Sequence, residues 1–240
     1  MDEGPCYKRI LLKLSGESLK GDNPSETGIS GTVIGNIAKE IRQVHDLGVQ
    51  VAVVTGGGNF FRGMRSNNLG IARSAADYMG MVATIINGIA LREVLEKQGL
   101  HARLVSALEI KAVAEPFSRR RALRHLDKGR IVIFSAGTGN PFFTTDTAAA
   151  LRAIEMEADV FLKATMVEGV YSDDPKKVKD SVKFHRISYS EVIARELKVL
   201  DITAVTLCKE NNLPIKIFNI TKPGNIIKAV TDKHIGTTIE

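Results

Sequence analysis

The sequence predicts an α/β fold: an αβα sandwich in which helices cover both faces of a mostly parallel central sheet. Apolar runs of strand length alternate along the chain with segments of helical periodicity, which is the pattern of such folds. The strand runs are apolar nearly throughout, as expected for strands buried on both faces. The length of 240 residues suits one large domain or two small ones, and no internal repeat is visible.

The predicted elements follow one another in a regular order. Residues 8–14 form a first strand, residues 49–55 a second, and a long helix runs from about Ala75 to Gln98. Between the two strands, apolar residues recur on one face of a helix: Val33, Ile34, Ile37, Ile41, Val44 and Leu47. The segments ARLVSA, RIVIF and DVFLKAT are three further strands, and PIKIFNI, a short helix and a terminal GTTI follow.

A long polar segment, residues 166–188, is the only candidate for a boundary within the chain. We expect it to divide two halves of one continuous sheet, so that residues 1–240 form a single domain. Ligands of such sheets bind beyond the carboxyl ends of the strands, and those ends are therefore where functional residues are expected.

Composition excludes several classes of function. The net charge is +6, but the basic residues are scattered apart from one cluster at residues 118–125, and few aromatics accompany them, which argues against nucleic-acid binding. A positive net charge favours small anionic substrates, because it attracts them. Cys6 and Cys208 have no metal-ligand spacing and are expected to be free thiols in a reducing compartment. Without an apolar run of membrane-spanning length or a signal-peptide pattern, we expect a cytoplasmic protein.

Two strands end in a lysine. Lys13 lies among apolar residues in ILLKLSG, and Lys163 occupies the same place in DVFLKAT. A lone lysine of this kind can simply extend its ammonium group to solvent. Two of them at the carboxyl ends of two strands can instead converge on one anionic ligand, because a compact ammonium group suits a phosphate.

The second strand ends in TGGGNFFRG, residues 55–63. Three successive glycines allow the backbone to approach a ligand closely and to aim N–H groups at it, and Arg62 could bind a phosphate with two hydrogen bonds. A flexible turn is the alternative interpretation. The Walker-type GxxxxGK[ST] loop, the dinucleotide-binding GxGxxG and the protein-kinase signatures are all missing from the chain.

The stretch SAGTGNPFFTTD follows a third strand and opens a helix, a position that favours an anion. Thr144 and Thr145 supply hydroxyl groups, while Phe142 and Phe143 can close off a pocket. Asp146 is unexpected beside a phosphate site. It is either the N-cap of the helix or an anion that holds the two strand-end lysines in place.

These motifs together resemble the bacterial uridylate (UMP) kinases of the amino acid kinase superfamily, and the resemblance covers the whole chain. The combination of GGGNFFRG with GTGNPFFTTD is especially specific, and KRILLKLSGE, DYMGM and GVYSDDP add to it. The resemblance implies transfer of the γ-phosphoryl group of ATP to UMP with Mg²⁺, in pyrimidine nucleotide biosynthesis. It also implies a homohexamer that GTP activates and UTP inhibits.

The resemblance also assigns residues. Independently of it, the pattern at the strand ends leads us to expect catalysis by Lys13, Asp146, Lys163 and Arg62. ATP would contact Lys13, Leu14, Ser15, Gly16, Gly58, Arg62, Thr165, Tyr171 and Asp174. UMP would contact Gly57, Asp77, Thr138, Gly139, Asn140, Pro141, Phe142, Phe143, Thr144 and Thr145. Asp77 is expected at the ribose hydroxyls, with a helix N-cap as its alternative role. UMP binding would occupy the half before about residue 165, and ATP binding the half from about residue 166 to residue 240.

Some features depart from the family pattern. The loop at residues 20–31 is longer than usual, and the family links that region to GTP activation, which leaves the effector response open. Met166 and Glu168 stand where the family often has a polar residue and Asp, so adenine contacts by these side chains are not assumed. No carboxylate cluster marks a protein metal cage, so Mg²⁺ is expected to be held mainly by ATP phosphates and water.

Two other functions are compatible with parts of the pattern. A related kinase that forms an acyl phosphate would share the fold and the lysines, but it would not need GTGNPFFTT. A nucleotide-binding module without catalysis would share the fold alone, and the presence of Lys13, Asp146 and Lys163 argues against it.

Overall fold

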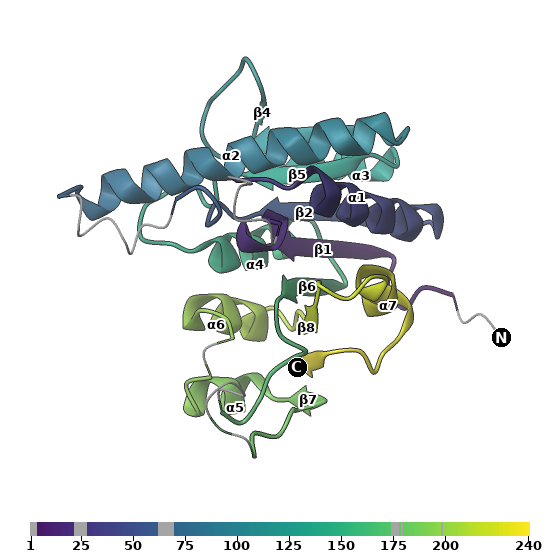
Figure 1. Cartoon of the computed structure of the whole chain (residues 1–240), viewed down its shortest axis with the longest axis vertical. Helices are drawn as coiled ribbons and strands as arrows, with labels where there is room; N and C mark the ends of the chain where they lie inside the picture. The colour runs from purple at the N-terminus through teal and green to yellow at the C-terminus, as the bar shows by residue number, and fades with distance from the viewer. Residues whose placement is uncertain (1–3, 22–27, 62–69, 174–177, 179, 198) are drawn as a thin grey trace.

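A single nine-stranded sheet runs through the molecule with the strand order β4-β3-β5-β2-β1-β6-β8-β9-β7. The computed structural model describes residues 4–21, 28–61, 70–173, 178, 180–197 and 199–240. From top to bottom, Figure 1 passes from β5 through β2, β1, β6 and β8 to β7, so the long axis of the molecule follows the strand order. All strand pairs are parallel except β8 with β9, and the predicted fold class is confirmed.

The first part of the chain builds the upper strands of Figure 1 and their helices. In order these are β1 (Arg9–Leu14), the 3-10 turn η1 (Glu17–Leu19), α1 (Gly31–Asp46), β2 (Gln50–Thr55), α2 (Arg73–Lys97), β3 (Ala102–Ser106), β4 (Glu115–Pro116), α3 (Arg119–Asp127), β5 (Ile131–Ser135) and α4 (Thr145–Glu155). Strands β1 and β2 begin and end within one residue of their predicted limits. The apolar strand patterns therefore located the centre of the sheet correctly.

The second part of the chain extends the same sheet on the other side of β1. Its elements are β6 (Val160–Thr165), β7 (Arg186–Ile187), α5 (Tyr189–Ala194), α6 (Ile202–Glu210), β8 (Ile215–Asn219), α7 (Asn225–Thr231) and β9 (Thr237–Ile239). Because β6 pairs with β1 and with β8, the sheet is continuous across residue 165.

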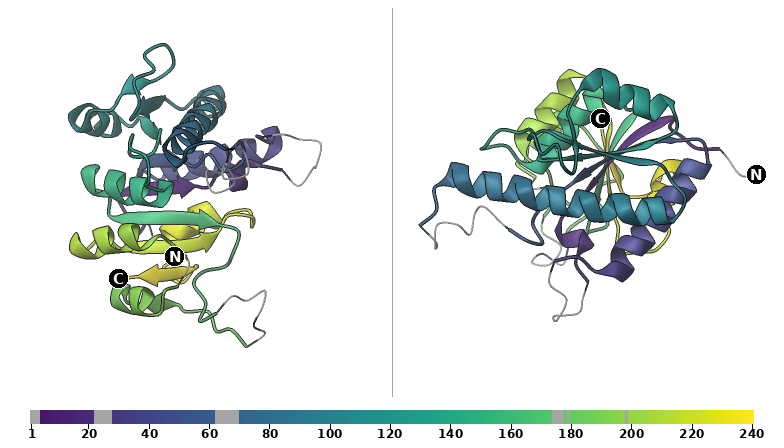
Figure 2. Two further views of the ribbon diagram at one scale, coloured as in Figure 1. Left: turned by 90° about the vertical axis from the view of Figure 1, so that its left-hand side faces the viewer. Right: turned by 90° about the horizontal axis from the view of Figure 1, so that it is seen from above.

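Helices cover both faces of the sheet, as Figure 2 shows in its right-hand view along the stack of strands. Side chains of α1, α2 and α7 pack on one face with Leu12 and Leu14 of β1. Side chains of α3, α4, α5 and α6 pack on the other face with Leu11. Alternate residues of each strand thus enter two separate cores, and Lys13 points to the same face as Leu11.

Helix α1 corrects one detail of the sequence analysis. Ile34, Ile37, Ile41 and Val44 are buried as predicted, but the helix ends at Asp46 and Leu47 is 42% exposed. The apolar periodicity continued one residue past the helix, because Leu47 is the C-cap and the chain turns at Gly48, which has a φ of 82°.

Helix α2 is long and apolar enough to cross a membrane by length and composition alone, and 44% of its most apolar window is buried inside the molecule. Leu91 and Leu95 of this helix are fully buried in the core shared with α1. A core helix of a globular domain passes the same test, and packing on the sheet accounts for the buried apolar residues of α2.

Candidate active site

Two lysines and one carboxylate form a buried cluster at the carboxyl ends of β1 and β6. Lys13 and Lys163 are register partners on these adjacent parallel strands. The Asp146 carboxylate reaches both: Oδ1 lies 2.7 Å from the Lys13 Nζ, and Oδ2 lies 2.6 Å from the Lys163 Nζ. The side chain of Asp146 is only 14% exposed. The three predicted residues are therefore brought together, with the carboxylate between the two ammonium groups.

Asp146 is not the N-cap of α4, which was its alternative interpretation. The Thr144 hydroxyl occupies the cap position and accepts hydrogen bonds from the backbone N–H groups of Asp146 and Thr147, at 3.1 and 3.2 Å. Because Thr144 satisfies the free donors of the first turn, the Asp146 side chain is left to face the lysines.

Burial and charge act in opposite directions on this cluster. Burial raises the pKa of the Asp146 carboxyl, but the charges of Lys13 and Lys163 outweigh it, so this pKa lies below its ordinary value. Burial lowers the pKa of the Lys163 ammonium group, and Asp146 opposes that effect only in part. The Lys163 Nζ also donates to the Val199 carbonyl. The carboxylate is thus firmly ionised, whereas Lys163 holds its proton less tightly than a free lysine.

Asp201 belongs to the site although the sequence analysis did not identify it. It is the N-cap of α6, where its Oδ1 accepts the Ala204 N–H at 2.7 Å. The same carboxylate accepts the Thr147 hydroxyl at 3.0 Å and the hydroxyl of Thr144. Asp201 therefore joins the start of α6 to the start of α4, on which Asp146 is carried.

The glycine loop after β2 lies directly against the loop after β1. A Cβ on Gly16 would stand 2.4 Å from the Gly58 nitrogen, and a Cβ on Gly57 would stand 2.6 Å from the Gly80 carbonyl oxygen of α2. Neither distance is sterically acceptable, so both positions require glycine for close backbone approach. The predicted phosphate residue Arg62 lies outside the described residues.

A cavity of about 380 Å³ joins this glycine loop to α2 and to the loop after β5. It is lined by seven of the residues implied for UMP and one implied for ATP: Gly57, Asp77, Thr138, Asn140, Phe143, Thr144, Thr145 and Gly58. Its lining also includes residues that the sequence analysis missed: Phe61, Ala76, Gly80, Met81, Thr84 and Gly137. The missed residues of α2, at positions 76, 80, 81 and 84, share one face of the helix, and Gly80 and Met81 lie three and four positions after Asp77 within the DYMGM motif.

Three residues implied for UMP, namely Gly139, Pro141 and Phe142, do not line the cavity. Phe142 adopts a left-handed backbone conformation with a φ of 72°, and its side chain is 69% exposed. Such a conformation is strained in a residue other than glycine and needs support from its surroundings.

Asp77 provides that support and is not a helix N-cap. Helix α2 begins at Arg73 with Ala72 as its N-cap, so the alternative interpretation of Asp77 is wrong. The Asp77 Oδ2 accepts the Phe142 backbone N–H at 2.8 Å, and the Arg73 Nε lies 2.9 Å from Oδ1. The Arg73 guanidinium stands 5.9 Å from the centre of the Phe142 ring. Asp77 therefore ties the loop after β5 to α2 at the wall of the cavity.

Of the later residues implied for ATP, Thr165 is the last residue of β6 and Tyr171 lies in the segment that follows this strand. The Thr165 hydroxyl bonds with the backbone of Val167, and Tyr171 forms an isolated bridge with Lys183. Asp174 lies outside the described residues. The Glu168 side chain is bound by the Asn219 amide at 2.8 Å and the Lys222 ammonium group at 2.9 Å, and these hydrogen bonds lower the pKa of its carboxyl.

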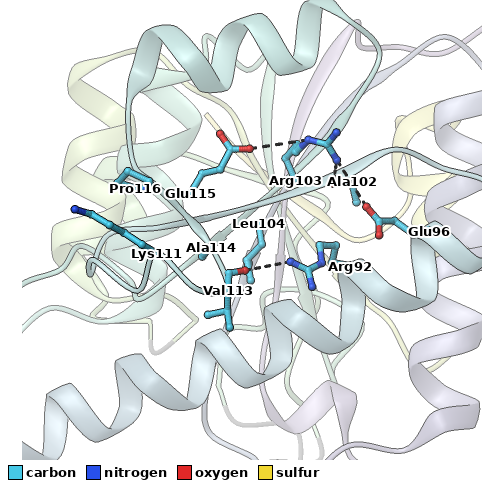
Figure 3. A pocket seen from close by; sticks show the side chains of 10 residues that line it. All are labelled: Arg92, Glu96, Ala102, Arg103, Leu104, Lys111, Val113, Ala114, Glu115 and Pro116. Atoms are coloured by element: carbon cyan, nitrogen blue, oxygen red, sulfur yellow. Dashed lines mark hydrogen bonds and ion pairs between the residues drawn. The ribbon is translucent and has the colours of Figure 1, made fainter.

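Two further cavities have a different character. One of about 710 Å³ lies between α1 and the turn before α7, and the half-exposed Met166 lines it. The other, of about 460 Å³, is shown in Figure 3 and lies by β3 and β4. There Arg103 lies between Glu96 and Glu115, at 3.7 and 3.9 Å, and Arg92 donates to the Val113 carbonyl. Lys13, Asp146 and Lys163 line none of these three cavities, but only the 380 Å³ cavity includes the start of α4, at Thr144 and Thr145.

Paired lysines, glycine loops and the start of a helix meet at the carboxyl edge of a parallel sheet. This combination is typical of a phosphotransferase that acts on small molecules. The model of the Amino acid kinase family matches residues 8–219. A relative from Paramagnetospirillum magneticum described as uridylate kinase is 53% identical over 97% of this chain and 96% of its own length. The chain therefore belongs to the amino acid kinase family and, within it, to the uridylate kinases.

Solved structures agree with this assignment. The crystal structure of UMP kinase from Bacillus anthracis superposes with a TM-score of 0.94 at 40% identity, covering 98% of this chain and 96% of that one. UMP kinase from Ureaplasma parvum gives a TM-score of 0.92 at 37% identity, covering 97% and 98%. Uridylate kinase from Archaeoglobus fulgidus gives 0.73 at 32% identity, covering 96% and 99%.

Proposed function

We propose that this protein is a UMP kinase that transfers the γ-phosphoryl group of ATP to UMP, giving ADP and UDP, in the pyrimidine nucleotide pathway towards CTP. The observation that carries the proposal is the cavity bounded by Gly57, Asp77 and Thr145. Thr145 is the first residue of α4, and the next residue in the chain is Asp146, whose carboxylate pairs with Lys13 and Lys163. A substrate phosphate in this cavity would meet positive charge at one end.

The division of labour follows from this arrangement. Lys13, Lys163 and Arg62 would neutralise charge on the transferred group, and Asp146 would hold the two lysines. ATP would lie over the ends of β1, β6 and β8, in the half from about residue 166 together with residues 13–16 at the end of β1. UMP would occupy the cavity formed by the half before about residue 165.

Phosphoryl transfer asks little covalent chemistry of the protein. The two phosphates must be brought into line, and the charge that develops on the transferred group must be neutralised. The phosphate of UMP is already a nucleophile at neutral pH, so a general base is not needed. This accounts for a cluster built of lysines and one carboxylate that is itself engaged with them.

Kinases of this class use Mg²⁺ together with ATP, and the ion would neutralise part of the negative charge of the phosphates. Among the described residues, no three His, Cys, Asp or Glu side chains gather as a ligand set. Both oxygens of Asp146 face ammonium groups. This donor set fits an ion carried mainly by the ATP phosphates and water.

A coupled assay of ADP release with ATP and each nucleoside monophosphate tests the proposal. UMP should be strongly preferred over CMP, AMP and GMP, because a polar site rejects ligands that leave its groups unpaired. Comparable kcat/KM for CMP would contradict the assignment of the substrate. Phosphorylation of a carboxylate substrate with none of UMP would indicate an acyl-phosphate-forming kinase instead.

The quaternary structure, the effectors and the location of the protein are further parts of the proposal. Four exposed apolar side chains line the outer face of α2: Tyr78, Met79, Val82 and Ile86. This surface suits contact with a second copy of the chain, in support of a homohexamer. Light scattering should give the hexamer mass, and Val82→Glu should lower the measured mass.

We further propose activation by GTP, inhibition by UTP and a cytoplasmic location. Initial rates measured with each effector test the regulation.

A further inference from the structure

A pair of asparagine side chains joins α2 to the glycine loop after β2. The Asn87 side chain is fully buried, and Asn59 is partly buried. The Asn59 Nδ2 donates to the Asn87 Oδ1 at 2.9 Å, and the Asn87 Nδ2 donates to the Asn59 Oδ1 at 2.8 Å. The two amides therefore face each other with reciprocal hydrogen bonds, an arrangement that only groups with both donor and acceptor can form.

Each amide also holds a backbone carbonyl. The Asn87 Nδ2 donates to the Gly56 carbonyl at 2.6 Å, and the Asn59 Nδ2 donates to the Gly28 carbonyl at 2.8 Å. Gly28 lies beside the ring of Phe60, where a Cβ would stand only 2.3 Å from a ring carbon. The pair thus fixes the beginning of the glycine loop to α2 and its end to the segment that precedes α1.

Backbone contacts confine the loop in other directions. Gly57 lies against the Gly80 carbonyl of α2, and Gly16 lies against the Gly58 nitrogen and the Asn59 side chain. The loop is therefore wedged between α2 and the turn after Lys13. These contacts prevent closer approach but do not prevent the loop from sliding along α2, whereas directional hydrogen bonds to a fixed amide do.

We propose that Asn59 and Asn87 are positioning residues that set the glycine loop in register with the turn at residues 15–16, and with it the gap between the two reacting phosphates. The inference rests on the proposed function, because the turn would hold ATP and the loop would face UMP. Neither amide needs to touch a substrate. A neutral amide pair suits this place, since a carboxylate in its position would repel both phosphates.

The alternative is a purely structural role, in which the pair only satisfies buried polar groups. Loss of a buried hydrogen-bond partner would then lower the thermal stability and leave the kinetics of the folded enzyme unchanged. A positioning role predicts a loss of kcat, because small misplacements of reacting groups are costly, up to about 10²-fold for an error of roughly 1 Å.

The test is a double-mutant cycle with Asn59→Ala, Asn87→Ala and the double variant, each measured by steady-state kinetics and thermal unfolding. If the residues act as one unit, each single variant should lose about 10-fold or more in kcat, with smaller changes in the KM of ATP and UMP. The double variant should be no worse than the poorer single variant by more than about 3-fold. Leu95→Ala is the control, because Leu95 is a fully buried residue of α2 that lies in the core away from the loop.

Two results would overturn the proposal. Folded single variants with the kcat of the unchanged enzyme would show a structural role only, and multiplying effects in the double variant would show that the residues act independently. Should Asn87→Ala fail to fold, Asn59→Leu keeps the approximate size of the side chain, adds no charge and removes the donor to Gly28 and Asn87, and it must still lower kcat. An unchanged enzyme that does not phosphorylate UMP would refute the proposed function instead, so the two failures are distinguishable.

Discussion

Lys13 and Lys163 are register partners on neighbouring parallel strands, and their ammonium groups meet at the single carboxylate of Asp146. The two buried ammonium groups would repel each other if the Asp146 carboxylate did not lie between them. The three groups together carry a net charge of +1, which leaves the cluster attractive to a phosphate while the lysines remain ordered. The fold thus places positive charge at a fixed point of the sheet edge.

The lowered pKa of Lys163 predicts the alkaline limit of the reaction. Because burial favours its neutral form, Lys163 should lose its proton below the ordinary lysine pKa of about 10.4. The activity that depends on its charge is complete at lower pH and is lost as the pH rises through the lowered value. A profile of kcat against pH should therefore fall on its alkaline side. In Lys163→Arg the remaining activity should fall only at higher pH, since the guanidinium group stays charged. A fall at the same pH in this variant would assign it to another group.

Asp77→Asn should raise the KM for UMP by about 10-fold and leave the KM for ATP within about 2-fold. The substitution keeps an oxygen to accept the Phe142 N–H but loses the charge that pairs with Arg73, a charge that the family resemblance assigns to the ribose hydroxyls. Steady-state kinetics with each substrate varied in turn give both constants. Equal changes in the two KM values would show that Asp77 supports the fold of the site without contacting UMP.

Asp201 should affect both stability and turnover through α4. Asp201→Ala removes the N-cap of α6 and the acceptor for the hydroxyls of Thr144 and Thr147, and we expect a stability loss of about 1–2 kcal/mol. Asp201→Asn can still cap α6, so its melting temperature should lie close to that of the unchanged protein. A lowered kcat in both variants would support the link to Asp146. A normal kcat in the folded Ala variant would limit Asp201 to capping.

The two thiols should differ in reactivity. Burial raises the pKa of the Cys208 thiol to about 12, and this side chain of α6 is fully buried in the core, whereas Cys6 is partly exposed. Alkylation at pH 8 should therefore label Cys6 in the folded protein, and both cysteines after unfolding. Peptide mass mapping distinguishes the sites. Rapid labelling of Cys208 under native conditions would show that this core opens readily.

Much of the site could be predicted because its residues break a simple pattern. Lys13 and Lys163 stood out as charges in apolar strands, and the fold rule for parallel sheets placed them at one edge. Their register could not be predicted, because it depends on the pairing of β1 with β6 across the long intervening chain. The N-cap of α4 could not be predicted either, because every residue of the sequence TTDT is of a type that can cap a helix.

Asp201 was missed for a related reason. It starts an ordinary helix, and its distinguishing contacts with Thr144 and Thr147 are made between helices that lie far apart in the sequence. The left-handed backbone at Phe142 was equally hidden, because the hydrogen bond to Asp77 that supports it is a tertiary contact. Local patterns thus revealed the charged groups at strand ends, whereas the residues that hold them in place required the assembled structure.

The kinetics of Asp146→Asn test the central claim most directly. The substitution keeps the shape of the side chain and leaves the Thr144 cap of α4 intact, so the protein should fold. It removes the negative charge that holds Lys13 and Lys163, and kcat should fall by roughly 10²-fold or more while the melting temperature shows a folded protein. A folded Asp146→Asn variant with a kcat within a few-fold of the unchanged enzyme would contradict the account and remove Asp146 from the mechanism.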